Sequence, residues 1–332
     1  MSFFAVLFAL LAEQLKPLSN LNPIHHGLTG WVRWAGRNFD AGADVHARVV
    51  WAITVLAPAA LIAVVYMLTD RYSTVLALGL DIAVLYLTLG FRQFSHHFTD
   101  IRDALEQGRE DRARELLAHW QNLDASELPR TELLRHVLEY SLLAAHRHVF
   151  GVFFWFVVLS SMDLGPAGAV LYRMAEFTSR YWSYRSQTTG AATHDRLMGL
   201  SQTLFSLVDH VPARLTAFGF AVVGNFEDAV DAWRRHAVLW VRPNEGTILS
   251  AASGALGVRL GGQVAPAVAE GHRDVTRTIN AGDTPDVIDA QGSTTGAVPQ
   301  LAHLRSVVGL IWRSMVLWML LLALLSLAHL IG

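Results

Sequence analysis

The chain has 332 residues, of which 52% are hydrophobic and only 16% charged, and its formal net charge is -2 with a pI near 6.7. Ordinary soluble proteins have about 25% charged residues, so this composition favours a membrane protein, and the near-neutral charge argues against a general nucleic-acid binder. Cysteine is absent, which excludes disulfide bonds, zinc-thiolate sites and thiol nucleophiles.

The first apolar segments predict membrane helices. The short stretch 3–12 lacks a basic start and a small-residue cleavage site, so we expect a retained interfacial or partly inserted helix instead of a signal peptide. Residues 49–69 carry no charge over 21 positions, enough helix to cross a hydrocarbon core about 30 Å thick. Residues 72–90 are apolar except for Asp81. An ionisable group is costly in lipid, so we expect Asp81 to face the protein interior or a polar cavity.

Residues 92–148 predict a polar helical insert. Acids and arginines dominate this stretch, and Gly108 separates two short helices. Apolar side chains recur on one side at helical spacing, which explains the charges as solvated helix faces. The apolar positions are Ile101, Leu105, Leu116, Leu117 and Trp120.

Three later segments are apolar as well. Residues 149–162 are short for a span and become long enough if the helix begins near Thr131. Residues 215–226 gain length if they join the apolar residues before Pro212, a kink that neighbouring groups must compensate. Residues 314–332 have no charge over 19 positions and predict a last spanning helix.

The chain divides by sequence into five consecutive stretches. They are N-terminal membrane segments (1–91), the cytoplasmic helical insert (92–148), a central membrane region with a glycine-rich motif (149–262), a polar loop or linker rich in Gly, Thr and Pro (263–304), and a C-terminal transmembrane helix (305–332). Together they predict an all-α polytopic integral membrane protein with about four or five transmembrane helices plus interfacial or re-entrant helices.

Basic residues predict the orientation. Arginine and lysine number four between positions 13 and 48, eight between 92 and 147, and eight between 234 and 313. By the positive-inside rule these three polar regions are cytoplasmic, in a bacterial inner membrane. The arginines at 173–214 fall on the other side by alternation, so we expect residues 165–181 to dip back or lie along the interface.

The histidines do not predict a metal site. His96 with His97, and His146 with His148, are adjacent or two apart, so the members of each pair do not share a helix face. No carboxylate stands at ligand spacing beside them. We therefore expect no metal ligands among them.

Several short sequence motifs between residues 154 and 262 are unusual. Four glycines occur in nine residues at 254–262, at a spacing that fits neither the dinucleotide motif nor the P-loop. These motifs and their order along the chain resemble those of the CobD/CbiB family of integral membrane proteins. They are Phe-Trp at 154–155, Gly-Pro-Ala-Gly-Ala at 165–169, Tyr-Arg at 172–173, Pro-Ala-Arg-Leu at 212–215, Pro-Asn at 243–244 and the glycine block. The resemblance implies an amide-forming enzyme of cobalamin synthesis that joins a corrinoid acid to aminopropanol or its phosphate.

The chain departs from that family where the synthases carry acids. Glu139 stands for the first acid, but Leu143-Ala144 and Arg147-His148 replace two acidic or amide pairs. Glu176 and Asp209 stand where the synthases have Asn. Hard cations need several oxygen ligands, so the losses weaken a magnesium site. The cofactors are therefore unknown, with Mg and ATP expected only if the synthase activity is retained.

The same pattern also resembles AmpE, a membrane relative linked to signalling around β-lactamase induction and without a known enzymatic role. The sequence leaves open a divergent synthase-like protein and an AmpE-like accessory protein. Expected partners are the lipid bilayer and a corrinoid or other anionic small molecule, and a homo-oligomer or membrane protein partner stays open.

The expected ligand site combines arginines with the glycine backbone. Arginine gives bidentate contacts to phosphate or carboxylate, and glycine N–H groups can surround an anion. Close helix packing is the alternative role for the glycines, and snorkelling into lipid headgroups is the alternative for Arg214 and Arg173. The candidate residues are Tyr172, Arg173, Glu176, Asp209, Arg214, Arg242, Asn244, Gly254, Gly257, Arg259, Gly261 and Gly262.

Overall fold

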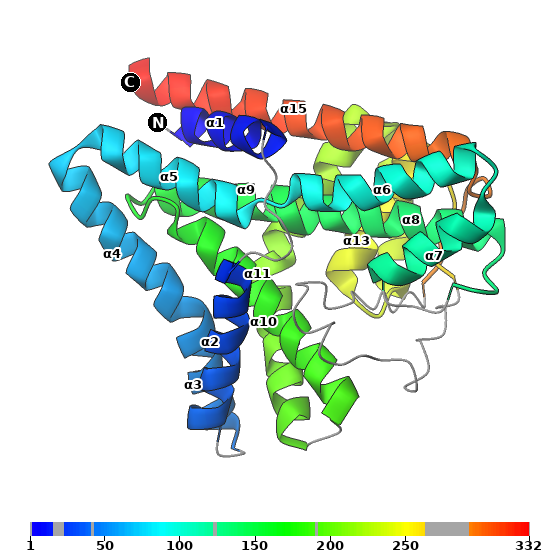
Figure 1. Ribbon diagram of the computed structural model, residues 1–332. Coiled ribbons are helices and arrows are strands. Elements are labelled where there is room, and N and C mark those ends of the chain that lie inside the picture. The colour runs from blue at the N-terminus through cyan, green and yellow to red at the C-terminus, as the bar shows by residue number, and fades with distance from the viewer. Residues whose placement is uncertain are drawn as a thin grey trace. The chain divides into compact units, whose positions relative to one another are not determined.

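The computed structural model describes residues 2–15, 23–40, 43–121, 125–189, 192–262 and 292–331. Within these ranges every regular element is a helix, so the expected all-α class is confirmed (Figure 1). Two isolated β-bridges join Val258 to Ala297 and Gly261 to Ser293. Most of the predicted polar loop, residues 263–291, lies outside the described residues.

The helices form two compact units, each assembled from separated parts of the chain, whereas the five stretches expected from sequence follow one another. Unit 1 draws its described residues from 1–90 and 147–209. Its helices are α1 (Ser2–Leu15), α2 (Pro23–Phe39), α3 (Asp44–Trp51), the π-helical turn η1 (Ala52–Leu56), α4 (Ala57–Tyr72), α5 (Thr74–Thr88), α9 (Gly151–Ser160), α10 (Ala167–Thr189) and the first part of α11 (Ala192–Val223).

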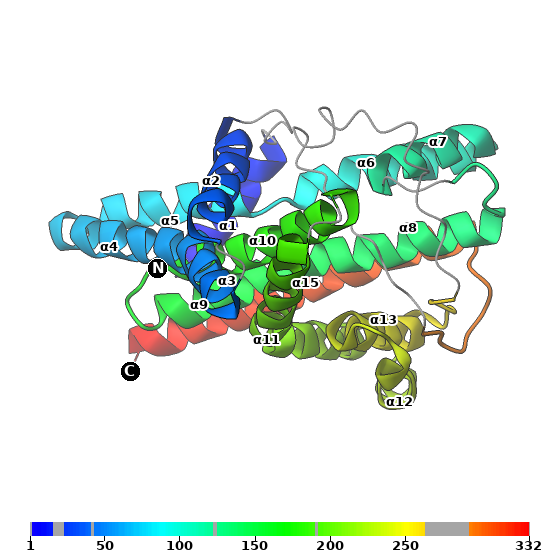
Figure 2. The ribbon, with the colours of Figure 1, turned by 90° about the horizontal axis from the view of Figure 1, so that it is seen from below.

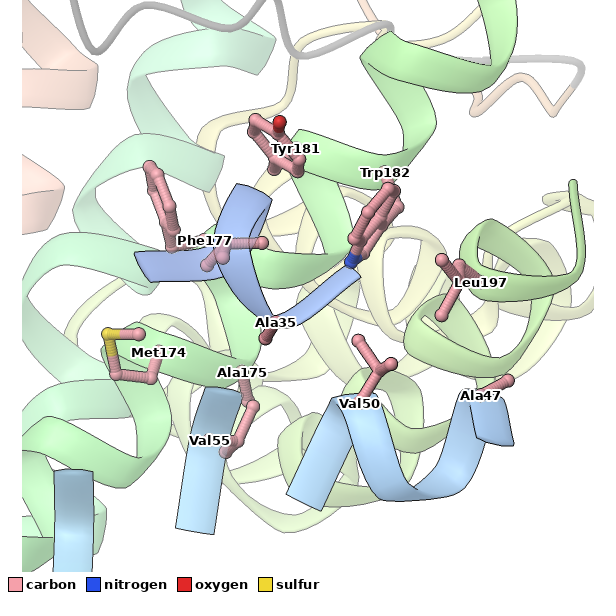
Figure 3. Close-up of a cluster of buried hydrophobic side chains, with 11 residues drawn as sticks. Ala35, Ala47, Val50, Val55, Met174, Ala175, Phe177, Tyr181, Trp182 and Leu197 are labelled. Atoms are coloured by element: carbon pink, nitrogen blue, oxygen red, sulfur yellow. The ribbon is translucent and has the colours of Figure 1, made fainter. Parts of the chain in front are cut away.

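The core of unit 1 lies between α10 and the helices that precede α4. Aromatic side chains from α10, including Phe177 and Trp182, point toward small and β-branched residues of α2, α3 and η1 (Figure 3). Trp182 lies so close to Gly36 that an added Cβ would come within 2.4 Å of its ring. This contact requires glycine in α2, because any larger side chain would displace the indole.

Helices α4 and α5 form an antiparallel hairpin that turns at Ser73, where the backbone is extended with φ -166° (Figure 1). Asp81 on α5 is 2% exposed, so the expectation that it faces the protein interior is confirmed. Gly165 adopts φ +54°, and an added Cβ there would strike the ring of Tyr66.

Unit 2 draws its described residues from 91–146, 210–262 and 292–331. Its helices are α6 (Phe91–Glu106), α7 (Glu110–Gln121), α8 (Arg130–Ala145), the second part of α11, α12 (Phe226–His236), the short 3₁₀ turn η3 (Ala237–Leu239), α13 (Pro243–Leu256) and α15 (Leu301–Ile331). Helix α8 packs against α6, α7, α13 and α15. The π-helical turn η2 (His146–Phe150) continues α8 into α9.

The two short helices predicted on either side of Gly108 are present as α6 and α7. Gly108, with φ +71°, separates the two helices as expected. Ile101 and Leu117 are fully buried, and Trp120 is stacked on His97. The polar face is exposed and carries ion pairs along the helix, such as Arg112 with Glu115 at 2.9 Å.

In the described part of the chain, three helices are long and apolar enough to cross a membrane: Asp44–Tyr72, Arg130–Ser160 and Leu301–Ala328. The second confirms that the apolar residues before Ser160 belong to a helix that begins near Thr131. Two shorter apolar helices, Phe3–Leu15 and Thr74–Thr88, accompany them. With the three long helices, one of the shorter helices crossing the membrane would give the expected four spans, and both would give five.

Helix α11 runs for 32 residues through Pro212, which confirms the helix predicted across that proline. Its residues 192–209 belong to unit 1 and 210–223 to unit 2. The helix ends at Val223, so Phe226 begins α12 instead of closing the apolar stretch.

Candidate functional site

A buried ion pair on α8 organises the glycine-rich motif of unit 2. Glu139 is fully buried, and the guanidinium Nη1 of Arg135 donates to its two carboxylate oxygens at 3.1 and 3.2 Å. Arg135 also donates from Nε to Glu132 at 2.9 Å. The spacings of three and four residues place all three side chains on one face of α8.

The carboxylate of Glu139 reaches the glycine motif. The backbone N–H of Gly261 donates to Glu139 Oε1 at 2.6 Å, across 122 residues of sequence. A charge-assisted bond of this kind is stronger than a neutral one. Because Glu139 has no access to solvent, its charge depends on Arg135 and on this N–H group.

Each amide from Gly257 to Gly262 has an acceptor inside the protein. Gly257 and Val258 donate to carbonyls at the end of α13, Arg259 to Ala297 at 2.8 Å, and Gly262 to Gly292 at 2.9 Å. Leu260 donates to Thr294 Oγ1 at 2.8 Å, and Ser253 donates to the same hydroxyl at 2.6 Å. The N–H groups expected to surround an anion are therefore bonded within the protein in this structure.

Steric requirements explain the glycines. Gly257 ends α13 in the left-handed conformation, with φ +65°, which is the usual role of glycine after a helix. An added Cβ at Gly261 would come within 2.0 Å of the Gly292 carbonyl oxygen, and one at Gly254 within 2.2 Å of the Asp228 carbonyl oxygen on α12. These contacts favour close backbone packing as the role of the motif.

The other predicted residues of unit 2 lie at the opposite end of α13. Arg214 on α11 donates to Asn244 Oδ1 at 3.4 Å, and Arg242 donates to Glu245 at 3.0 Å. Helix α13 has 14 residues, so about 20 Å of helix separates this end from the exposed Arg259. Arg242 and Arg259 therefore do not meet in one pocket.

The predicted residues of unit 1 form their own buried cluster. Tyr172, which is fully buried, donates its hydroxyl to Asp209 Oδ1 at 2.8 Å. Glu176 is 1% exposed and accepts from Arg173 at 3.0 Å and from Arg180 at 3.1 Å. Burial raises the pKa of the Tyr172 phenol well above 10.0, and the charge of Asp209 raises this pKa further.

The positions where the chain departs from the synthases are also buried. Leu143 and Ala144 are 1% and 2% exposed, and Arg147 is 5% exposed. The carboxylates of Glu139 and of Glu176 each bond arginines. Among the described residues, no group of three or more His, Asp or Glu side chains could hold a metal ion. Apolar side chains and a guanidinium are not the oxygen ligands that magnesium prefers.

Sequence reasoning missed the residues that hold the glycine motif. Arg135, Ser253 and Thr294 were not singled out, although they make the bonds that fix Glu139 and Leu260. The i, i+4 spacing of Arg135 and Glu139 was a visible signal of an ion pair. No local signal connected Thr294 with the motif, because their pairing depends on the fold.

Fold and site together define a helical membrane protein with buried ion pairs next to its sequence motifs. The chain belongs to the CobD/CbiB family: the family described as CobD/Cbib protein matches residues 7–287. A relative named cobalamin biosynthesis protein CobD, from Stutzerimonas stutzeri, is 31% identical over 73% of this chain and 71% of its own length. A protein of the same name from Chromobacterium violaceum is 35% identical over 54% of this chain and 55% of its own length. No solved structure matches the chain.

Proposed function

We propose that this chain acts in cobalamin biosynthesis as a CobD/CbiB-like membrane protein that binds an acidic corrinoid or another anionic small molecule, without conventional magnesium-dependent amide synthesis. Family membership and the relatives named cobalamin biosynthesis protein CobD support the pathway. The observation that carries the proposal is the pairing of Glu139 with Arg135 on α8, the helix that also carries the apolar Leu143 and Ala144.

Complementation tests the chemistry. The chain is expressed in a bacterial strain that lacks the family's synthase, and growth is followed on the corrinoid acid precursor. We expect poor or no rescue, while a working synthase expressed to the same membrane level restores growth. Growth near the rate given by that synthase would overturn the loss of the amide-forming activity.

Binding tests the ligand class separately. The purified protein in lipid nanodiscs is titrated with a corrinoid carboxylic acid, and the bound corrinoid is followed by its visible absorption. The matched probe is the amide of the same corrinoid, which lacks the negative charge. We expect the acid to bind more tightly. An absence of binding, together with altered β-lactamase induction on deletion of the gene, would favour the AmpE-like accessory role.

We propose a bacterial inner-membrane location with the insert on the cytoplasmic side, supported by the arginines of α6 and α7. The natural chain has no cysteine, so Asp111→Cys gives a single labelling position. The Asp111 side chain is 98% exposed in the structure. We expect a membrane-impermeant maleimide to react only after the cytoplasmic side is opened. Reaction in intact cells would reverse the orientation.

A further inference from the structure

The connection between α12 and α13 carries an exposed apolar projection. Val238, Leu239 and Val241 are 81%, 56% and 54% exposed, although they lie within four residues of one another. Trp240 between them is buried and packs on Gly246 and Gly292, where an added Cβ would come within 2.6 and 2.7 Å of the indole. The tryptophan therefore fixes this segment while its aliphatic neighbours point outward.

Basic side chains stand directly before the projection. Arg234 and Arg235 are exposed in the last turn of α12, and Arg235 donates to Asp231 on the same helix at 2.8 Å. The opposite face of α12 is buried through Ala229 and Ala232, and the helix packs against α13 (Figure 2). A fixed apolar projection beside arginines is the chemistry that lies at the surface of an anionic bilayer.

The neighbouring surface of unit 2 is apolar as well. On α11 an exposed stripe recurs at helical spacing through Val211, Leu215, Phe218 and Val222, with exposures of 49%, 38%, 51% and 44%. Gly219 on the same helix lies against Trp318 of the membrane-compatible segment Leu301–Ala328, because an added Cβ there would be 3.3 Å from the indole nitrogen.

Two contacts bring the start of the stripe, near Leu215, and the projection to the same end of α13. Arg214, next to Leu215, bonds Asn244 in the first turn of α13. Trp240, between the projecting residues, packs on Gly246, which also lies in the first turn of α13. The projection therefore continues an apolar surface that reaches a membrane-compatible helix, which favours lipid over a soluble protein as its partner.

We infer that Val238, Leu239 and Val241 insert into the headgroup region of the bilayer, with Arg234 contacting anionic lipid headgroups. This interfacial anchor is distinct from the spanning helices. It stands on unit 2 geometry alone and does not depend on the proposed function.

Spin-label accessibility tests the anchor in the full chain. Single variants Leu239→Cys and, as a matched water-exposed control on α12, Asp231→Cys are labelled with a nitroxide in nanodiscs that contain phosphatidylglycerol. Collisions of the nitroxide are measured with two reagents: oxygen, which concentrates in lipid, and a nickel chelate, which stays in water. For an apolar group buried about 5–10 Å into the interface, the oxygen-to-nickel accessibility ratio at position 239 is expected to exceed that at position 231 by about five-fold or more.

Each other outcome overturns the anchor. Equal ratios at positions 239 and 231 would place the projection in water. Low access for both reagents at position 239, with spin–spin broadening, would show a second copy of the chain covering it. The arginine contribution is read from Arg234→Gln in the Leu239→Cys background, measured with and without phosphatidylglycerol. Anionic lipid is expected to raise the ratio only when Arg234 is present, and the same response in the variant would remove Arg234 from the headgroup contact.

Discussion

Two buried carboxylates of this protein meet arginine in different ways. Glu139 in unit 2 is bonded by Arg135 on its own helix and by the N–H of Gly261, which is distant in sequence. Glu176 in unit 1 is bonded by Arg173 and Arg180, both on α10. The Glu139 contacts therefore join α8 to the glycine motif, whereas these Glu176 contacts join side chains of a single helix. The comparison indicates that a carboxylate near a family motif can have a structural role.

The largest expected effect separates these two carboxylates. Glu139→Ala removes the acceptor of the Gly261 N–H and one of the two carboxylates bonded by the guanidinium of Arg135, which is 3% exposed. Removing one partner of a buried pair costs about 3–5 kcal/mol of unfolding free energy. Glu176→Ala should cost less, about 1–3 kcal/mol, because Arg173 and Arg180 are 22% and 13% exposed and gain water more readily.

The measurement is denaturant unfolding in detergent micelles, followed by tryptophan fluorescence. Glu132→Gln is the control on α8, because the Glu132 side chain is 39% exposed and glutamine keeps an oxygen that can accept from Arg135, so a smaller loss is expected. Equal losses for Glu139→Ala and Glu176→Ala would break the comparison and show that the bond to Gly261 contributes little.

A second prediction tests whether the glycine motif is packed. Gly261→Ala places a methyl group within 2.0 Å of the Gly292 carbonyl oxygen, at a backbone φ of +83°. We expect a loss of about 2 kcal/mol or more, since a strained backbone position alone costs about 1–3 kcal/mol. Gly199→Ala is the control, because the space around Gly199 is open and alanine favours the helix by about 0.5–1 kcal/mol. An unchanged midpoint for Gly261→Ala would show that the motif opens easily.

A third prediction concerns the pH dependence of unit 1. The pKa of Tyr172 is raised in the folded protein, so the folded state keeps the phenol protonated where the unfolded chain begins to release its proton. The stability that depends on this proton is fully present below about pH 10 and is lost as the pH rises above that value. Tyr172→Phe should lack this part of the alkaline loss, and it should also lose about 1–3 kcal/mol at neutral pH because Asp209 is left buried without the hydroxyl.

Unfolding midpoints of wild type and Tyr172→Phe are compared between pH 7 and pH 11, so that other titrating groups cancel in the difference. Tyr86→Phe serves as the matched tyrosine control. Parallel curves for wild type and Tyr172→Phe across this range would contradict the raised pKa of Tyr172.

The sequence predicted those parts of the fold that depend on local pattern. Charge-free runs, the helical spacing of Ile101 and Leu117 and the break at Gly108 located helices that the structure contains. The bonds of the glycine motif could not be predicted in the same way, because Glu139, Gly261 and Thr294 come together only in the folded chain. Glycine-rich sequence is compatible both with anion binding and with close packing, and only the acceptors of the N–H groups distinguish the two roles.

The last prediction concerns ligand affinity and the two arginines Arg242 and Arg259, at opposite ends of α13. Loss of a charged hydrogen bond to a ligand costs about 1.5–3 kcal/mol, so replacing the arginine that contacts the anion should weaken binding by about ten-fold or more. Because about 20 Å of helix separates the two side chains, we expect only one of Arg242→Ala and Arg259→Ala to show this loss with a corrinoid carboxylic acid. Lysine at the sensitive position should restore part of the affinity, because it keeps the charge but not the bidentate geometry. Unchanged binding in the double variant would remove both arginines from the site and leave packing and lipid contact as their roles.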